Sequence, residues 1–235
     1  MGKRIVVAID GPAGAGKSTI ARRLADRLGF LYIDSGAMYR AVGLWALETN
    51  VALSDMHRLE QLAGEARIEF RNGVSTVLLN GRDVTEAIRK PEIAAAASQV
   101  AAVPAVRRAL VNQQRAMSEK ASVVMEGRDI GSVVFPAADV KIFLDAHEDS
   151  RTERRLKDLE SAGQPATPED VARELQERDH RDRTRAESPL MQAPDAVYVD
   201  TTGRLIDEVE EMLLKIVRER TSNGKELHRD GEVKE

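Results

Sequence analysis

The sequence predicts an α/β fold: a doubly wound, five-stranded parallel sheet with helices on both faces. The main observation is that short apolar runs of strand length alternate with stretches of helical spacing along the 235 residues. A second is the glycine-rich turn that joins the first such run to the first helical stretch. A third is an inserted segment, 67–79, where two alternating runs beside Asn-Gly pairs predict a small antiparallel β element.

Each element follows from its own pattern of apolar residues. Strands are predicted at 4–9, 30–33, 122–125, 140–144 and 196–200. Helices are predicted at 18–28, 41–47, 53–66, 91–103, 105–121, 150–159 and 204–220, and a further one carries Val171 and Leu175. The segment 163–167 interrupts the helical pattern and is predicted to act as a hinge.

We expect a cytoplasmic enzyme, because the sequence offers no segment that would direct it to a membrane or out of the cell. There is no cysteine, so neither disulfides nor thiolate metal sites are available. No apolar stretch approaches the roughly 18 residues of a membrane span, and the net charge of −4 disfavours a global nucleic-acid surface. Arginine outnumbers lysine 26 to 9, a bias that genome composition or repeated binding of phosphate by the planar guanidinium explains equally well.

The glycine-rich turn, Gly11 to Ser18, fits the phosphate-binding pattern G-x-x-x-x-G-K-[ST]. Its backbone N–H groups would surround a phosphate, Lys17 would add a point charge, and the Ser18 hydroxyl would reach Mg²⁺. The sequence therefore predicts an ATP site that comprises Gly11, Pro12, Ala13, Gly14, Ala15, Gly16, Lys17, Ser18 and Thr19.

Two further polar clusters follow predicted strands, at the edge where open α/β sheets bind ligands. Ser35, Tyr39 and Arg40 follow the strand at 30–33, although an ordinary helix cap with Arg40 in solvent explains this spacing equally well. Glu126 opens a cluster of acids, arginine and glycines at 126–131, after the strand at 122–125. A carboxylate at that position can hold Mg²⁺ through water.

Two helical segments are rich in arginine. Arg151, Arg154 and Arg155 share one face, for which a salt-bridged exposed helix is the alternative explanation. The run 178–185 has no apolar residue over eight positions and places Arg178 and Asp182 on one face with Arg185. A helix that packs on a core would show an apolar stripe there, so a functional role is favoured over disorder.

These pieces indicate a phosphotransferase with an anionic acceptor. A phosphate monoester is mostly ionised at pH 7, so it needs no general base. The remaining task is to align two polyanions and neutralise the charge that develops between them. The alternatives are a P-loop kinase for another small phosphate or acid, and an ATP-gated binding or switch protein.

Five segments together resemble the bacterial cytidylate kinases, a family of P-loop nucleoside monophosphate kinases. They are residues 11–18, 34–40, 98–101, 127–131 and 178–183, and the resemblance extends over nearly the whole chain. It implies transfer of the ATP γ-phosphoryl group to CMP or dCMP with Mg²⁺, by a monomer that binds neither nucleic acid nor membrane. It also implies one domain at 1–222, with a core (1–35, 122–147, 190–222), an NMP-binding region that contains the β insert (36–121), a lid with the arginine-rich helix (148–189), and a flexible tail at 223–235.

The resemblance also implies roles for individual residues. Ser98, Arg107 and Asp129 would read cytosine, and Arg178 and Asp182 would lie near the sugar. The acceptor phosphate would be bound by Ser35, Tyr39, Arg40, Arg128 and Arg185, and ATP also by Arg151, Arg154 and Arg155. The catalytic residues would be Lys17, Arg128, Arg154 and Arg185, and the metal residues Ser18 and Glu126. Glu126 departs from the Asp of many relatives, and we expect activity to be retained.

Overall fold

The computed structural model describes residues 3–71, 76–161 and 163–221. Its central sheet has the order β2-β6-β1-β7-β8, and every pair of neighbours is parallel, as predicted. The strands are β1 (Val6–Asp10), β2 (Leu31–Asp34), β6 (Val123–Gly127), β7 (Val140–Asp145) and β8 (Val197–Asp200).

Alternation along the central strands sends successive side chains into two different cores. In β6, Val124 joins a cluster with helices α1 (Lys17–Leu28) and α8 (Ile206–Arg220). Its neighbours Val123 and Met125 join a cluster on the opposite face with α5 (Pro104–Ser118). Because both faces are covered, these strands are apolar throughout rather than alternating.

A second body of helices lies almost entirely within residues 36–121, the segment predicted to be the NMP-binding region. It contains α2 (Ser35–Glu48), α3 (Met56–Glu65), α4 (Pro91–Val100) and α5, with the short 3₁₀ turn η1 (Ala87–Arg89). The predicted antiparallel insert is confirmed as a three-stranded sheet of β3 (Ile68–Arg71), β4 (Thr76–Leu79) and β5 (Arg82–Asp83). The predicted Asn72-Gly73 turn lies outside the described residues.

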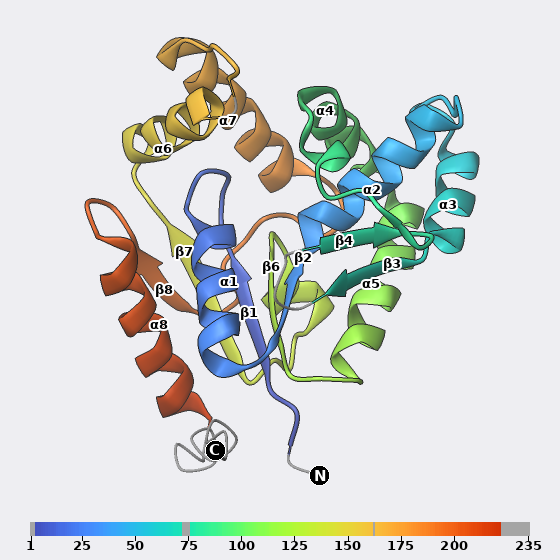
Figure 1. The fold of residues 1–235 in the computed structure, drawn as a ribbon. Coiled ribbons are helices and arrows are strands. Elements are labelled where there is room, and N and C mark those ends of the chain that lie inside the picture. The colour runs from blue at the N-terminus through green and yellow to red at the C-terminus, as the bar shows by residue number, and fades with distance from the viewer. Residues whose placement is uncertain (1–2, 72–75, 162, 222–235) are drawn as a thin grey trace, which may run out of the picture.

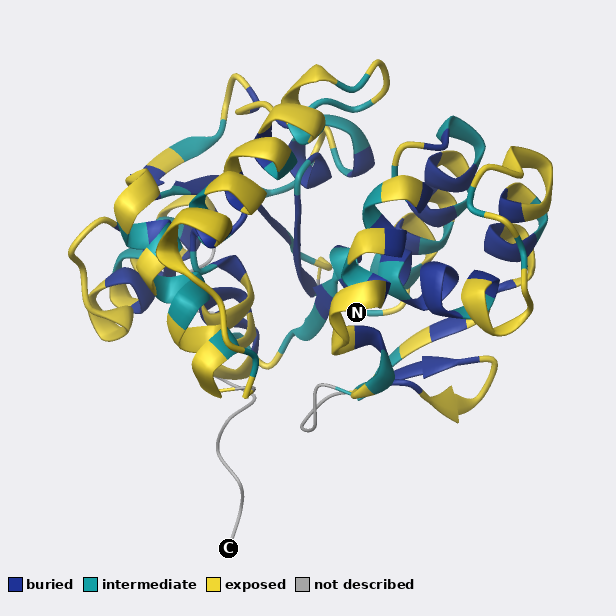
Figure 2. Cartoon of the chain, turned by 90° about the horizontal axis from the view of Figure 1, so that it is seen from above, coloured by how far each residue is buried: buried dark blue, intermediate teal, exposed yellow. Residues whose placement is uncertain are grey.

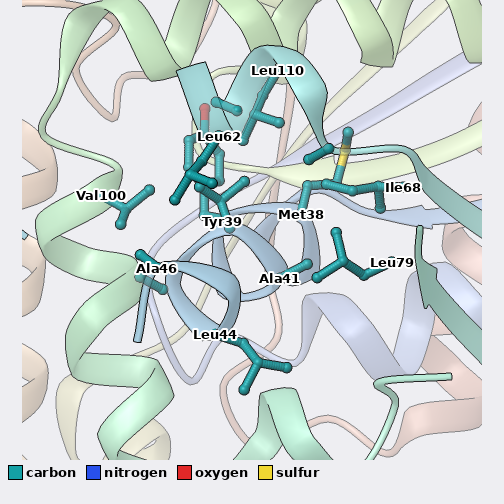
Figure 3. Packing of buried hydrophobic residues seen from close by; sticks show 14 of the residues in the cluster. Met38, Tyr39, Ala41, Leu44, Ala46, Leu62, Ile68, Leu79, Val100 and Leu110 are labelled. Atoms are coloured by element: carbon teal, nitrogen blue, oxygen red, sulfur yellow. The ribbon is translucent and has the colours of Figure 1, made fainter. Parts of the chain in front are cut away.

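The NMP-binding region has a hydrophobic core of its own. Met38 and Leu59 are fully buried in it, and Leu110 of α5 closes it. Figure 3 shows Met38 and Leu110 among the side chains packed around α2, with Ile68 of β3 and Leu79 of β4 at one side. Each fully buried Leu or Met contributes about 1.5–3 kcal/mol relative to an exposed one.

Two helices form a hairpin over the carboxyl edge of the sheet, α6 (Glu148–Ser161) and α7 (Pro168–Thr184). Figure 1 shows this hairpin above the turn between β1 and α1, with α2 and α4 across from it. Residues 178–184 of the charged run form the C-terminal part of α7, and Arg185 follows directly as its C-cap. Figure 2, viewed from above, shows largely exposed outer surfaces on this hairpin.

Two further expectations concern membrane spans and the end of the chain. No helix in the described part of the chain is long and apolar enough to cross a membrane. The flexible tail predicted at 223–235 lies outside the described residues.

Candidate active site

The glycine-rich turn adopts a backbone that requires its glycines. Gly11 has φ +150° and passes so close to β7 that a Cβ atom would lie 1.9 Å from the carbonyl oxygen of Leu144. Gly14 and Gly16 have φ +75° and +87°, in the left-handed region that glycine adopts without strain. The turn delivers the chain into α1, whose N-terminus favours an anion.

Lys17 is buried inside this turn. Its Nζ donates to the carbonyl oxygen of Pro12 at 2.6 Å. Burial and the nearby Arg128 lower the pKa of Lys17 to about 7. A bound polyphosphate would favour the charged form, so the lysine is suited to respond to an anionic ligand.

Asp10, the last residue of β1, holds the neighbouring loop in place. Its two carboxylate oxygens accept from the backbone N–H groups of Ile130 and Gly131, each at 2.7 Å. These groups begin the five-residue π-helical turn η2 (Ile130–Val134). Burial raises the pKa of Asp10 to about 6, despite the opposing effect of these hydrogen bonds. The sequence did not predict these hydrogen bonds, because an acid at the end of a strand shows no local pattern that identifies its partner.

The acceptor side of the site contains ion pairs among the residues predicted to bind CMP. Arg107 Nη2 lies 2.5 Å from Asp129 Oδ2, and both side chains are buried. Arg128 Nε lies 2.9 Å from Asp182 Oδ2, while Arg185 lies within 3.7 Å of both acids. Burial acts to raise the pKa of Asp182, but Arg128 and Arg178 lower it below its usual value.

Arg178 lies in the same surroundings. Burial, followed by the proximity of Arg128, lowers its pKa to about 10. Several arginines are therefore held close together at the cost of mutual repulsion, which an anion would relieve.

Three buried guanidinium nitrogens on this side have no hydrogen-bond partner among the described residues. They are Arg40 Nε, Arg107 Nε and Arg185 Nη2. A buried donor without an acceptor costs about 1–3 kcal/mol, and such groups call for an explanation. A ligand with several acceptor oxygens would supply the missing partners.

The helix cap that the sequence offered for the segment 34–40 is present, whereas the binding of a ligand by this segment stays a prediction. Asp34 caps α2 by accepting from the backbone N–H of Ala37 at 2.9 Å. Arg40 is nevertheless not in solvent, because it pairs with Asp34 at 2.5 Å and lines the cleft with Ser35 and Tyr39. Burial raises the pKa of Tyr39 to about 12, so its hydroxyl stays protonated and can donate.

Glu126 lies at the end of β6, facing the turn. Tyr32 donates to its Oε1 at 2.5 Å, and the Ser18 hydroxyl also bonds to this carboxylate. Burial and then Asp34 raise the pKa of Glu126. No group of three or more His, Cys, Asp or Glu side chains in the described residues could hold a metal. Mg²⁺ commonly uses only one or two protein oxygens plus substrate phosphates, and Ser18 with Glu126 fits that arrangement.

On the donor side, Arg154 is held against the turn by a residue that sequence reasoning missed. It donates to the hydroxyl and carbonyl oxygens of Thr201 at 2.9 and 2.7 Å. Arg204 and Ile206 line the cleft beyond it. Thr201 directly follows β8, so the rule that ligands bind at the carboxyl ends of strands could have found it.

Most of the predicted site residues line one cleft with a volume of about 490 Å³, within the usual range for ligand sites. Gly11, Pro12 and Arg151 are the predicted site residues absent from its lining. The lining includes the others: Ala13, Gly14, Ala15, Gly16, Lys17, Ser18, Thr19, Ser35, Tyr39, Arg40, Ser98, Arg107, Glu126, Arg128, Asp129, Arg154, Arg155, Arg178, Asp182 and Arg185. Whether each contacts a substrate stays a prediction.

A glycine-rich turn of the P-loop pattern and a group of arginines line one cleft at the edge of a parallel sheet, and this combination defines the class of the protein as a P-loop kinase. The family model described as "Cytidylate kinase" matches residues 7–219, so the chain belongs to the cytidylate kinase family.

Individual comparisons agree with this assignment. The cytidylate kinase of Solibacter usitatus is 60% identical over 96% of this chain and 97% of its own length. That of Desulfitobacterium hafniense is 45% identical over 95% of this chain and 97% of its own. An uncharacterized Eubacterium ventriosum protein of known structure is 15% identical, with a TM-score of 0.54 over 92% of this chain and 99% of its own, which shows a shared fold alone.

Proposed function

We propose that the protein transfers the γ-phosphoryl group of ATP to CMP or dCMP, giving ADP and CDP or dCDP. The observation that carries this proposal is the set of three buried guanidinium nitrogens, on Arg40, Arg107 and Arg185, that have no hydrogen-bond partner among the described residues. The three side chains line the same cleft as the P-loop, and a nucleoside monophosphate bound there would present phosphate and base oxygens to them. Family membership supports the choice of nucleotide.

The reaction needs positioning and charge stabilisation rather than a base. The P-loop and Lys17 would hold the β- and γ-phosphates, and Arg40, Arg128 and Arg185 would hold the acceptor phosphate in line with them. As the bond to the leaving oxygen breaks, Lys17, Arg128, Arg154 and Arg185 would stabilise the charge on the transferring group. Closing of the lid would exclude water, the competing acceptor.

Mg²⁺ would be held by Ser18 and, through water, by Glu126, and it would neutralise charge on the phosphates. Tyr32 keeps the Glu126 carboxylate directed toward Ser18. The longer side chain of Glu would therefore still be able to bind Mg²⁺ through water. We include in the proposal that the enzyme acts as a monomer in the cytoplasm.

Asp129 would select the base. A carboxylate accepts from the N4 amino group of cytosine but faces an acceptor in uracil. Arg107 pairs with Asp129 and holds its carboxylate in place.

A coupled assay of ADP release with CMP, dCMP, UMP, AMP and dTMP tests the proposal. We expect CMP and dCMP to be preferred by at least ~10-fold in kcat/KM, the size of one good hydrogen bond to a charged group. Equal rates with all five acceptors would contradict the assignment. The absence of turnover with any of them would favour an ATP-gated binding protein.

A further inference from the structure

A buried ion pair contacts the P-loop from behind, outside the cleft. Arg151 Nη1 lies 2.5 Å from Asp179 Oδ2, and each residue is only 4% exposed. Arg151 belongs to the first turns of α6 and Asp179 to the C-terminal half of α7. The pair therefore joins the two helices of the lid hairpin.

Both partners also bind the backbone of one P-loop residue, Ala13. Arg151 Nη1 donates to the carbonyl oxygen of Ala13 at 3.1 Å, and Asp179 Oδ1 accepts from its N–H at 3.3 Å. The Ala13 side chain packs on Val171 and Leu175 of α7. The loop is thus fixed to the lid by two hydrogen bonds and an apolar contact.

This geometry disfavours direct contact between Arg151 and ATP. The charge of Arg151 is neutralised by Asp179, and its Nε donates to the carbonyl oxygen of Ala146 at 3.1 Å. A Cβ atom on Gly14 would lie 3.0 Å from the Cβ of Arg151, which places this side chain behind the loop. Arg154, one turn further along α6, lines the cleft instead.

Helix α7, which carries Asp179, also reaches the acceptor side. Arg178 and Asp182 of α7 line the cleft, while Asp179 between them is buried against Ala13. Asp182 in turn bonds Arg128. A continuous path of contacts therefore runs from the acceptor arginines through α7 to the P-loop.

We propose that Arg151 and Asp179 are positioning residues that clamp the P-loop at Ala13 and link it through α7 to the acceptor side. The inference rests on the proposed function, since it assigns these residues a role in that reaction. Misplacement of reacting groups by about 1 Å can cost ~100-fold in rate. A loosened loop would therefore lower kcat without removing any contact to CMP.

Steady-state kinetics of Arg151→Met, Asp179→Asn and the double variant test the clamp. Both single variants should lose ~10- to 100-fold in kcat, with the KM for CMP changed by less than about twofold. The double variant should lose no more than the more damaged single variant, because residues acting as one unit are not additive. The matched control is Arg173→Met, which removes an exposed arginine of α7 paired with Asp170 and should behave like the wild type.

Hydrogen exchange of the P-loop backbone, measured on the peptide spanning 10–17 of the full chain, gives a readout that needs no activity. Exchange should be at least ~10-fold faster in both single variants and unchanged in Arg173→Met, because the Ala13 N–H loses its protected environment. Arg151→Lys keeps the charge but cannot reach all three acceptors. Arg151→Lys should have an intermediate effect on kcat and on the exchange rate, and it replaces Arg151→Met as the test if that variant does not fold.

Two results would overturn the clamp. One is a higher KM for ATP in Arg151→Met with normal kcat, while Asp179→Asn resembles the wild type, which would make Arg151 an ATP ligand. The other is a lower melting temperature in both variants with unchanged kcat and exchange, which would make the pair purely structural. If the wild type does not phosphorylate CMP, the proposed function fails, whereas the exchange data still decide on the clamp.

Discussion

Asp129→Asn replaces the buried acid that is predicted to read the base. The substitution keeps the size of the side chain and removes its charge. Asp129 pairs with Arg107 at 2.5 Å and lies 3.7 Å from Arg185. The variant therefore leaves two neighbouring arginines without their common counter-charge, one of them almost fully buried.

The cost in stability follows from that burial. Breaking a buried pair by removing one partner costs about 3–5 kcal/mol. The lower end applies because Arg107 keeps a hydrogen bond to the carbonyl oxygen of Ala101 at 3.2 Å. About 3 kcal/mol corresponds to a fall of roughly 6–12 °C in the melting temperature for a chain of this size.

The effect on kcat/KM should differ between the two pyrimidine nucleotides. Loss of a hydrogen bond to a charged group costs about 1.5–3 kcal/mol, so kcat/KM for CMP should fall ~10- to 150-fold. The asparagine amide can donate to the acceptor that uracil presents, so UMP should lose less or gain. The KM for ATP should stay within about twofold of the wild type.

Differential scanning calorimetry and the coupled assay measure both effects. Glu86→Gln, which breaks the exposed pair with Arg89, is the control and should shift the melting temperature by less than about 2 °C. An unchanged ratio of CMP to UMP turnover would refute the base-reading role of Asp129. An unchanged melting temperature would refute the argument from burial.

Three other predictions concern the P-loop and the acceptor arginines. The pKa of Lys17 is about 7 in the free protein, and a bound phosphate should raise it, so ATP binding at pH 8 should take up ~0.9 proton. Calorimetry in two buffers measures this uptake. The Lys17→Arg variant should take up none, and equal uptake by both proteins would show that Lys17 is not the group that binds the proton. Arg128→Met should raise the KM for CMP ~10- to 100-fold in the coupled assay, and a rise confined to ATP would reverse its assignment. Gly11→Ala should abolish soluble expression or lower the free energy of unfolding by more than ~4 kcal/mol, because its Cβ would lie 1.9 Å from the carbonyl oxygen of Leu144. Gly29→Ala, at a residue with φ +66° and nothing within 4 Å, should lower it by only about 1 kcal/mol. Similar unfolding curves for the two variants would show that β7 moves aside.

The sequence was most informative where one pattern determines one structure. The central strands are buried on both faces, so they form continuous apolar runs that are easily recognised. The P-loop was equally clear, because its glycines are dictated by backbone angles and by the close approach of Leu144. The β insert followed from its turn residues and alternating pattern.

Contacts between distant segments could not be predicted in the same way. Asp179 stands in a run of charged residues, and nothing local shows that it alone turns toward Ala13 while Arg178 and Asp182 line the cleft. Helical periodicity placed Arg151 on one face with Arg154, yet the rotation of α6 sends Arg151 behind the loop. Thr201 escaped notice because its role depends on Arg154, far away in the chain.

The separate core of the NMP-binding region has a consequence for how this architecture can diversify. Its buried cluster, from Ala37 to Leu110, shares no member with the cluster that holds α1 and α8 on the sheet. Replacements within one cluster can therefore be accommodated with little repacking of the other. Residues of the first cluster can change by substitution while α1, α8 and the face of the sheet that they cover stay as they are. The helices around α2 can thus vary without disturbing the helix that follows the glycine-rich turn.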